Sequence, residues 1–442
     1  MDGAVDGAVD TVEVDVAVVG AGACGVLTAL RAAEDPDLVV GVFEKSLREG
    51  CNAEISSGSL AAGGTCFQRA AGIADSPARH AEDILAASGD TTAEPVVQAL
   101  CAAAPRYVEW LAETLGYPVE IGTDLPRAGM SVPRLHTDAG RLGGRRLMRH
   151  LREALATRPN VALVDEAPAV RLTTTGGRVD GVVVEQNHAL VRVRATTVVL
   201  ALDGFGANQV LMKEHCASLG DPFYGGVSTS TGDAIPWLTE LGAGFRNMAA
   251  CLRSGLVVLG HGTRVSPSLP FYGAVLLDLD GRRFVDEEAH GYSSLAGLIQ
   301  QLPAQRAALV WDAEAHAATR ESELMRETVR AGGFTTYADH AGLAAALGHD
   351  PELDPLPGRR RLEPPYHLAW VTHGVLATQG GAVVDPAGQV LRTDGTPIPG
   401  LRAGGGTAAG LAGPDSSGYS SGNGLLSAFG MGWIVGSELA GG

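Results

Sequence analysis

The clearest pattern of apolar and polar positions lies near the start of the chain. An apolar run at 14–19 is followed by a glycine turn, an Ala- and Leu-rich stretch to about Ala33, and a second apolar run at 39–43 that ends at Glu44. Apolar runs of this length, bounded by turn residues, are typical of buried strands, and the stretch between them has helical length. The pattern predicts a β-α-β unit.

Further along, the spacing of apolar residues predicts helices over 77–116 and from about Gly424 to Leu439. Pro95 and Pro105 are expected near helix starts, where proline is tolerated. Residues 161–202 change to short strand-like runs separated by turn residues, which predicts a small antiparallel meander. The runs lie at 161–164, 169–172, 179–184, 191–193 and 198–202.

Three other segments suggest how the chain is organised. Residues 50–65 are too polar for a core strand and too glycine-rich for a stable helix, so we interpret them as a loop that contacts a ligand. Residues 225–345 are mixed in pattern. The proline-rich, charged segment 354–365 is expected to connect two domains.

Composition narrows the class of protein. A length of 442 residues suggests about three domains, or two large ones. No run approaches the ~18 apolar residues that a membrane span requires. Thirty-three Lys and Arg against 50 Asp and Glu give a net charge of −17, which disfavours nucleic acid as a partner. The acidic start lacks the pattern of a secretory signal, so we expect a cytoplasmic protein.

Glycine and cysteine usage are also informative. Glycine occurs 60 times in 442 residues, about twice its usual share, which predicts many close backbone approaches. The six cysteines show no C-x-x-C and no haem or iron–sulfur spacing. We therefore expect reduced, mostly packed thiols and no metal site.

The glycine turn is Gly20-Ala21-Gly22-Ala23-Cys24-Gly25, placed between a predicted strand and a predicted helix. In this G-x-G-x-x-G pattern the first glycine permits the tight turn, the second lets the backbone approach a pyrophosphate, and the third allows close helix–strand packing. Glu44 follows Gly25 by 19 residues, where a carboxylate can bind ribose hydroxyl groups and disfavours NADP. An adenine dinucleotide is predicted, and these residues do not separate NAD from FAD.

Several further motifs resemble the fumarate reductase/succinate dehydrogenase flavoprotein superfamily of FAD-binding-2 type, which includes the 3-ketosteroid dehydrogenases. The resemblance covers nearly the whole chain. The family patterns are G-N-S-x-x-S-G-G, T-G-D-G, D-G-x-R-F-V-N-E, T-x-G-G and I-P-G-L-Y-A-A-G-E. Their counterparts here are Asn52-Ala53-Glu54-Ile55-Ser56-Ser57-Gly58-Ser59 with Ala62-Gly63-Gly64-Thr65, Thr231-Gly232-Asp233-Ala234, Asp280-Gly281-Arg282-Arg283-Phe284-Val285-Asp286-Glu287, Thr378-Gln379-Gly380-Gly381 and Ile398-Pro399-Gly400-Leu401-Arg402-Ala403-Gly404-Gly405.

The resemblance implies an α/β fold with a Rossmann-like FAD-binding domain of the glutathione-reductase type, formed by 1–224 and 346–442. It also implies an inserted α+β capping domain, 225–345, with substrate between cap and flavin. Asn52 stands where succinate dehydrogenases have the histidine that carries covalent FAD, so noncovalent FAD is expected. The residues expected to contact FAD are Gly20, Gly22, Ala23, Cys24, Gly25, Glu44, Lys45, Asn52, Ser57, Gly58, Gly63, Gly64, Ala169, Asp203, Gly204, Gly405, Gly424, Leu425 and Leu426.

The chain departs from the family at positions that bear on substrate. The histidine and arginine that bind dicarboxylate in fumarate reductases fall on Leu376 or Ala377 and on Tyr419. The family's proton-donating arginine falls near His290-Gly291-Tyr292, and Gly406 replaces the glutamate of A-A-G-E. These departures argue against fumarate or succinate as substrate and place the chain nearer to the ketosteroid dehydrogenases.

The segment Tyr419-Ser420-Ser421-Gly422-Asn423-Gly424 resembles the Y-P-G-P-G stretch of ketosteroid dehydrogenases, where a tyrosine acts at the carbonyl. Tyr419 is therefore the candidate electrophile or acid, since a phenol can polarise a ketone while another group moves the α-proton. Tyr292 or His290 is the candidate proton-transfer group. Weaker candidates are Arg283, Arg134 and His136. The backbone amides near Gly422 and Gly424 are expected to face the flavin.

These observations predict an FAD-dependent dehydrogenase, or ene-reductase, that acts on a C–C bond next to a carbonyl in a small molecule, with an electron acceptor or donor that the sequence does not identify. One alternative is a flavin oxidase resembling L-aspartate oxidase. Another is a noncatalytic FAD-binding or electron-transfer protein. The segment 418–422 also fits the G-x-S-x-G elbow of serine hydrolases, but no histidine follows it, and that order excludes the α/β-hydrolase arrangement.

Overall fold

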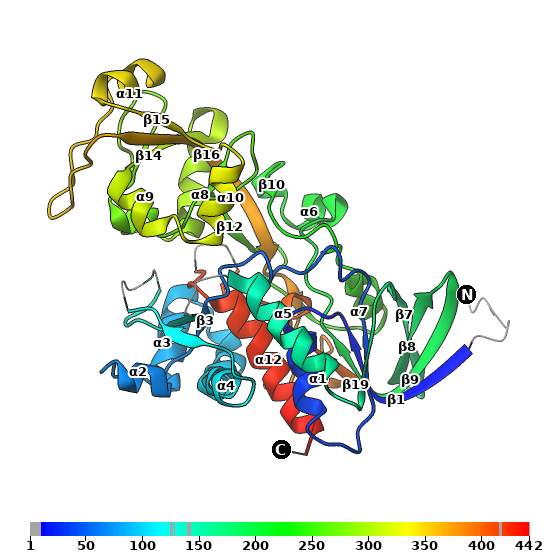
Figure 1. The fold of residues 1–442 in the computed structure, drawn as a ribbon. Coiled ribbons are helices and arrows are strands. Elements are labelled where there is room, and N and C mark those ends of the chain that lie inside the picture. The colour runs from blue at the N-terminus through cyan, green and yellow to red at the C-terminus, as the bar shows by residue number, and fades with distance from the viewer. Residues whose placement is uncertain (1–9, 124–126, 128, 139–142, 415–417, 442) are drawn as a thin grey trace.

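A computed structural model describes residues 10–123, 127, 129–138, 143–414 and 418–441. The chain forms two parts, a larger α/β part that holds both ends of the described chain and a smaller part that carries a second sheet (Figure 1). Residues 1–9, on which the prediction about a secretory signal partly rests, lie outside the described residues. The predicted α/β class is confirmed.

The larger sheet has five parallel strands in the order β6, β2, β1, β9, β19, with β18 antiparallel beside β19 and the hairpin β7–β8 attached to β9. Val19 lies opposite both Phe43 and Leu200, so the carboxyl ends of three strands meet at one edge. Ligands of open parallel sheets bind at this edge. The strands are β1 Asp10–Val19, β2 Val40–Phe43, β6 Val161–Val164, β7 Ala169–Thr175, β8 Arg178–Gln186, β9 Ala189–Leu200, β18 Gln389–Leu391 and β19 Pro397–Ala403.

The first β-α-β unit is confirmed, with helix α1 Ala23–Ala32 between β1 and β2. The closing helix, α12 Asn423–Leu439, lies beside α1 and packs on its other side against α4 Glu94–Glu113 (Figure 1). Buried residues of these helices and of the sheet form one large apolar core. Because both α1 and α12 begin at the carboxyl edge of the sheet, their first turns face the same space.

The region predicted as helical over 77–116 forms two helices, α3 Pro77–Ser88 and α4. The break follows Gly89, whose φ of 63° ends α3 in the left-handed conformation. Pro95 lies in the first turn of α4, as predicted. The prediction for Pro105 is wrong, because it lies inside α4, in a helix long enough to absorb one missing hydrogen bond through its tertiary packing.

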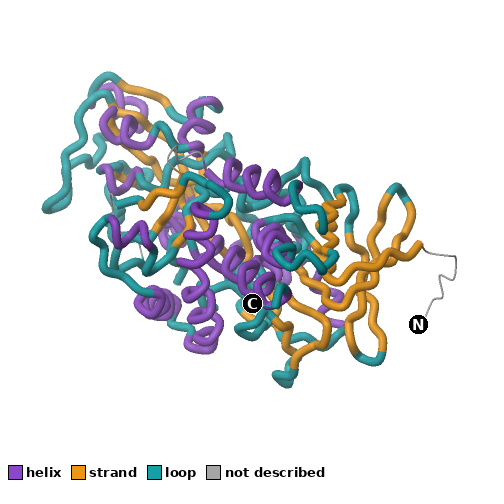
Figure 2. The backbone as a smooth tube through the Cα atoms, turned by 60° about the horizontal axis from the view of Figure 1, so that its bottom comes forward, coloured by secondary structure: helices purple, strands orange, loops and turns teal. Residues whose placement is uncertain are grey.

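The predicted meander over 161–202 is correct only in its later part. β7, β8 and β9 pair antiparallel in succession, whereas β6 leaves them and joins β2 in parallel. The runs at 191–193 and 198–202 merge into the single strand β9. Figure 2 shows these long strands gathered at one end of the molecule.

The second sheet centres on one long strand, β16 Tyr366–Thr378, which pairs antiparallel with β12, β14 and β15 and parallel with β10, while β13 pairs with β14. In Figure 1 it runs from the smaller part down into the larger one. Apolar clusters cover both faces of this sheet. The elements of this part are β10 Phe223–Tyr224, β12 Cys251–Val258, β13 Val275–Leu277, β14 Arg306–Asp312, β15 Thr335–Tyr337, α8 Tyr292–Gln301, α9 Ala313–Thr319, α10 Glu323–Arg330 and α11 His340–Leu347.

The division at 224/225 and 345/346 stays a proposal. Strand pairing favours a second boundary near 378, because β16 belongs to the second sheet along most of its length.

Short elements complete the larger part. β3, β4 and β5 form a small sheet beside α2. β11, which follows α7 in the chain, pairs with β17. The strand β17 is only two residues long. These elements are β3 Leu60–Ala61, α2 Cys66–Ala70, β4 Val119–Ile121, β5 Leu135–Asp138, α5 Gly143–Ala156, α6 Gln209–His215, α7 Ala234–Glu240, β11 Phe245–Arg246 and β17 Gly381–Ala382.

Candidate active site

A cavity of about 450 Å³ lies between the two parts of the chain. The larger part contributes the ends of β1, β2 and β9, the loop at 50–59 and the start of α12. The smaller part contributes 264–272, 290–292 and 318–324. The cavity therefore begins at the carboxyl edge of the parallel sheet and ends against the second part.

The glycine turn after β1 has the geometry that its sequence predicts. Gly20 has a φ of 104°, and a Cβ on Gly25 would lie 1.9 Å from the carbonyl oxygen of Gly20. A Cβ on Gly22 would meet only the Cβ of Cys51, at 3.7 Å, because Gly22 borders the cavity. The first turn of α1 holds no acidic residue. Its free N–H groups and positive helix end suit a bound phosphate.

Glu44 lies at the end of β2, on the cavity wall. Its Oε2 accepts a hydrogen bond from the N–H of Ala21 at 2.7 Å, and its Oε1 accepts one from the N–H of Ser46 at 2.9 Å. A carboxylate has about four acceptor sites, so capacity for ligand hydroxyl groups remains. The carboxylate is thus fixed beside the glycine turn.

Lys45 also borders the cavity, but its ammonium group is engaged by the Thr231-Gly232-Asp233-Ala234 motif. Its Nζ donates to Oδ2 of Asp233 at 2.8 Å and to Oγ1 of Thr231 at 2.7 Å. The residue therefore joins the first β-α-β unit to a segment almost two hundred positions later.

The loop at 50–59 is anchored through Asn52. Its Nδ2 donates to Oδ2 of Asp203 at 2.6 Å, and its Oδ1 accepts the N–H of Val227 at 3.0 Å. Ser57 borders the cavity, whereas Gly58 and Gly63 do not. A Cβ on Gly58 would meet the backbone of Gly143, and one on Gly63 would meet the carbonyl oxygen of Ser76 at 2.6 Å. These glycines serve close packing of the loop.

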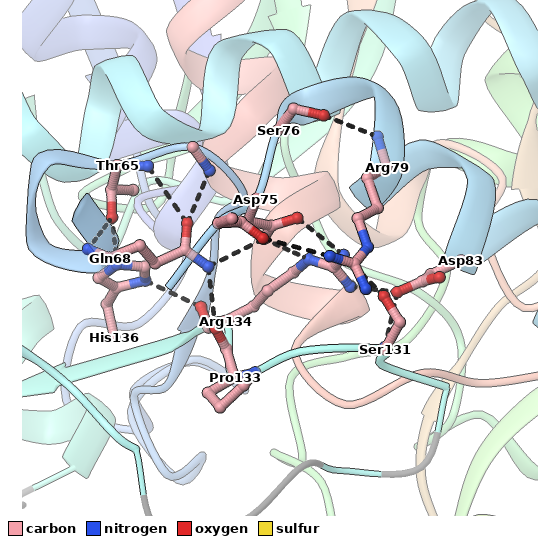
Figure 3. A network of polar contacts seen from close by, with 12 residues as sticks. Thr65, Gln68, Asp75, Ser76, Arg79, Asp83, Ser131, Pro133, Arg134 and His136 are labelled. Atoms are coloured by element: carbon pink, nitrogen blue, oxygen red, sulfur yellow. Dashed lines mark hydrogen bonds and ion pairs between the residues drawn. The ribbon is translucent and has the colours of Figure 1, made fainter. Parts of the chain in front are cut away.

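A buried polar network holds the segment behind this loop (Figure 3). Arg134 is fully buried and donates to both carboxylate oxygens of Asp75, at 2.8 and 3.0 Å, and to Asp83 at 2.5 Å. Figure 3 also shows Gln68 linked to Asp75 and to the carbonyl of Pro133. The Arg134 guanidinium is therefore committed to two carboxylates.

His136 is also fully buried, beside the same network. Its Nδ1 donates to the carbonyl oxygen of Arg134 at 2.8 Å, so its Nε2 is the acceptor for the hydroxyl of Thr65 at 2.8 Å. Burial lowers the pKa of His136 to about 4. A neutral histidine with both nitrogens engaged, away from the cavity wall, holds the loop, and we leave His136 and Arg134 out of the proposed chemistry.

Two tyrosines face each other across the cavity. Tyr292, the first residue of α8, and Tyr419, just before α12, have ring centroids 6.3 Å apart at an angle of 62°. The Oη of Tyr419 accepts the N–H of Gly424 at 3.0 Å. The interaction between the two hydroxyl groups raises the pKa of Tyr292 and lowers that of Tyr419.

Burial dominates the titration of both phenols. It raises the pKa of Tyr419, and the amide of Gly424 opposes this shift. The pKa of Tyr292 lies well above its usual range, first because of burial and then because of Tyr419, while the positive charge of Arg264 opposes the shift. Both phenols are therefore neutral near pH 7. The amide of Gly424, which we expected to face the flavin, is instead engaged by Tyr419.

The other catalytic candidates differ in position. His290 borders the cavity, two residues before Tyr292. The expectation for Arg283 is not supported, because its guanidinium pairs with the buried carboxylate of Glu287, away from the cavity wall. Arg283 and Glu287 both belong to the Asp280–Glu287 motif, so this ion pair lies within the motif.

Most of the residues expected to contact FAD border the cavity. Those on its wall are Gly20, Gly22, Ala23, Cys24, Glu44, Lys45, Asn52, Ser57, Ala169, Asp203, Gly405, Gly424 and Leu425. Those behind it are Gly25, Gly58, Gly63, Gly64, Gly204 and Leu426. Gly204 packs on Thr378, and Leu426 lies in the apolar core.

Arg264 is a wall residue that the sequence did not suggest. It is half-buried, and its Nη2 donates to the carbonyl oxygen of Ile55 at 2.7 Å. Burial lowers the pKa of its guanidinium. Phe271 and Met130 add apolar surface to the cavity wall. No motif or spacing marks these positions, because they come together only when the second part folds over the first.

The remaining expectations concern metals and membranes. Within the described ranges, all six cysteines are free thiols and no cluster of His, Cys, Asp or Glu could hold a metal ion. Among the same residues, no helix has the length and apolar character needed to cross a lipid bilayer. The expected cytoplasmic location stays a prediction.

Comparison with known proteins gives a consistent result. The model of the "FAD binding domain" family matches residues 15–424. NADH:fumarate oxidoreductase of Klebsiella pneumoniae is 25% identical over 96% of this chain, which spans only 47% of that relative's length. Fumarate reductase (cytochrome) of Shewanella frigidimarina is 26% identical over 97% of this chain and 77% of its own.

A solved structure is similar over the whole length of both proteins. The 3-ketosteroid-Δ4-(5α)-dehydrogenase of Rhodococcus jostii RHA1, in complex with 4-androstene-3,17-dione, has a TM-score of 0.74 at 24% identity and covers 97% of each chain. This likeness concerns the fold, and it agrees with the predicted architecture.

The residues around the cavity fit FAD. Gly22 leaves room for a pyrophosphate where α1 begins, and Glu44 stands ready for ribose hydroxyl groups. The wall of the same cavity also includes Asn52, the start of α12 and the tyrosine pair.

Proposed function

This chain belongs to the FAD binding domain family, the flavoprotein superfamily that its motifs resemble, and from that premise we propose that it is an FAD-dependent oxidoreductase acting on a C–C bond next to a carbonyl. The substrate is a small molecule with a ketone or enone group. When bound, FAD accepts or supplies a hydride at flavin N5. FAD is held noncovalently, since the Asn52 amide has no nucleophilic nitrogen for a flavin linkage.

The observation that carries this proposal is the setting of Tyr419. Its oxygen accepts the N–H of Gly424 at 3.0 Å, and its ring lies 6.3 Å from that of Tyr292, centroid to centroid. A phenol oxygen that accepts a hydrogen bond still has its own O–H to donate. That proton can bind a carbonyl oxygen in the cavity, and the incoming hydrogen bond from Gly424 makes it a stronger donor.

Tyr292 is the proposed proton-transfer group at the carbon next to the carbonyl. Its raised pKa keeps it neutral, so it is ready to donate a proton when the C=C bond of an enone is reduced. For dehydrogenation it must first lose its own proton, and the positive charge of Arg264 favours that anion. His290 lies on the same wall and is the second candidate for this role.

The second part of the chain completes the site by covering it. Phe271 and Leu295 of this part border the cavity. Apolar walls exclude water from the reacting groups, which strengthens hydrogen bonds to the carbonyl and prevents loss of the transferred hydride to solvent.

The proposal is tested by anaerobic titration of the purified holoprotein with paired enones and saturated ketones. We expect an enone to reoxidise the reduced flavin, or a saturated ketone to bleach the oxidised one. Tyr419→Phe should retain FAD and slow that reaction by about 10² to 10³-fold. Tyr337→Phe, on β15 in the second part of the chain, is the matched control and should react like the unchanged protein.

Equal rates in Tyr419→Phe and the control would contradict the role of Tyr419. A flavin that no member of the panel reduces or reoxidises would contradict the substrate class. Stoichiometric hydrogen peroxide formed in air would instead identify the flavin oxidase alternative.

A further inference from the structure

Asp203 has an unusual backbone for an aspartate. It lies three residues after the end of β9, and its φ is 72°. Residues other than glycine rarely adopt positive φ, and they are kept there when the surrounding structure or a function requires it. The strain therefore indicates that a side chain is needed at this position.

The carboxylate of Asp203 is held in one orientation. Its Oδ2 accepts hydrogen bonds from Nδ2 of Asn52 and from Oγ of Ser230, each at 2.6 Å. In the part of the chain that the structure describes, no group donates to Oδ1. Asp203 borders the cavity. One fixed oxygen is thus left as an acceptor at the cavity wall.

Gly406 makes room for this oxygen. A Cβ at position 406 would lie 2.4 Å from Oδ1 of Asp203, so any side chain there would collide with the carboxylate. Position 406 is also where the resembling A-A-G-E motif has its glutamate. The chain lacks a carboxylate at 406 and carries one at 203 that fills the same space.

The position of Asp203 in the sheet suggests its partner. Glu44 follows β2, the glycine turn follows β1, and Asp203 follows β9, and β1 lies between the other two strands. With neighbouring strands about 4.8 Å apart, β2 and β9 lie roughly 10 Å from each other on either side of β1 and its glycine turn. FAD carries hydroxyl groups on both sides of its pyrophosphate, on the ribose of the adenosine and on the ribityl chain of the flavin.

We propose that the carboxylate of Asp203 accepts a hydrogen bond from a ribityl hydroxyl group of FAD, in the space left by Gly406. Glu44 holds the ribose on the other side of the turn. Asn52 and Ser230 act as positioning residues, because they fix which oxygen of Asp203 faces the cofactor. This inference rests on FAD binding and is independent of the substrate proposed above.

The experiment measures the affinity of the holoprotein for FAD and for its 2′-, 3′- and 4′-deoxyribityl analogues, by competition of each analogue against bound FAD. The unchanged protein should bind one analogue about tenfold more weakly than FAD, the effect of removing a hydrogen bond to a charged group. Asp203→Asn should bind FAD more weakly and distinguish that analogue from FAD by less than about twofold. Asp203→Gly, which suits the positive φ, is the second variant and should behave in the same way.

Glu44→Gln is the matched control on the other side of the turn. It should weaken FAD and all three analogues by the same factor. The proposal is overturned if both Asp203 variants distinguish an analogue from FAD as strongly as the unchanged protein does. It is also overturned if Glu44→Gln loses this difference in affinity and Asp203→Asn keeps it. Because the readout is cofactor affinity, failure here leaves the proposed reaction untouched, and failure of Tyr419→Phe leaves this inference untouched.

Discussion

The two sides of the cavity present different kinds of chemical groups. On the cofactor side, the groups that face the ligand are backbone amides of the glycine turn and carboxylates at strand ends, each held by hydrogen bonds. On the opposite side, the wall consists of half-buried side chains such as Tyr292, His290 and Arg264. Backbone groups cannot change identity with the sequence, whereas side chains can. The chemistry of the cofactor side therefore depends largely on backbone geometry, whereas that of the opposite side depends on which side chains stand there.

The same contrast appears in what supports each side. Behind the cofactor loop lies the network of Arg134, Asp75 and Asp83, in which the Arg134–Asp75 ion pair is fully buried. Behind Tyr292 lies α8, which carries no side-chain cap at its start. Changes on the cofactor side should thus cost folding stability, while changes on the opposite side should alter rates in a protein that still folds.

The largest expected effect is at the third glycine of the turn. Gly25→Ala would place a Cβ 1.9 Å from a backbone oxygen, and we expect it to lower the free energy of unfolding by at least about 3 kcal/mol. Gly22→Ala is the matched control, because its Cβ meets nothing closer than 3.7 Å. It should fold normally and lose FAD. Denaturant unfolding and the bound flavin spectrum measure the two effects, and equal destabilisation by both variants would contradict this reading of the turn.

The next effect concerns the network of Figure 3. Asp75→Asn removes a carboxylate from the fully buried Arg134 and should lower the free energy of unfolding by about 3 kcal/mol. Asp83→Asn, whose side chain is 19% exposed, should cost about 1 kcal/mol. Chemical denaturation of the two holoproteins provides the test. Equal stability of Asp75→Asn and Asp83→Asn would show that burial does not set the contribution of each ion pair to the free energy of unfolding.

The smallest effect lies on the opposite side and changes only rates. Dehydrogenation needs the Tyr292 anion, and the pKa of Tyr292 lies well above its usual range. The anion fraction, and with it the rate of flavin reduction by a saturated ketone, should rise by about tenfold per pH unit between about pH 6 and 9. Reduction of an enone uses the neutral phenol and should stay constant over the same range. Stopped-flow measurement of both half-reactions tests this, and a pH-independent dehydrogenation would assign the proton to another group.

The contrast between the two sides also explains what could be predicted from the sequence. The turn from Gly20 to Gly25 and the carboxylate of Glu44 were predictable, because local spacing determines a strand, a turn and a helix start. The pairing of β6 with β2 was not, since it joins segments more than one hundred residues apart and both are short apolar runs.

Other predictions from the sequence failed for local physical reasons. Gly63 and Gly64 match a cofactor motif but pack against Ser76, and Arg283 matches a catalytic position but pairs with Glu287. A motif identifies which residue types occur together, and it does not tell whether they face a ligand or each other. Arg264 could not be found at all, because its neighbours Ile55 and Tyr292 lie on separate segments that meet only in the folded chain.

The continuity of β16 has a consequence for rebuilding this protein. Its 13 residues span roughly 40 Å, and its last residue, Thr378, accepts the N–H of Phe205 beneath the cavity at 3.1 Å. A chimera that exchanged only residues 225–345 would leave the central strand of the transplanted sheet behind. A graft that includes the strand must also bring a residue at 378 that packs on Gly204, where a side chain would meet the threonine at 2.1 Å. The exchangeable module is therefore larger than the inserted segment, and it ends at the floor of the site.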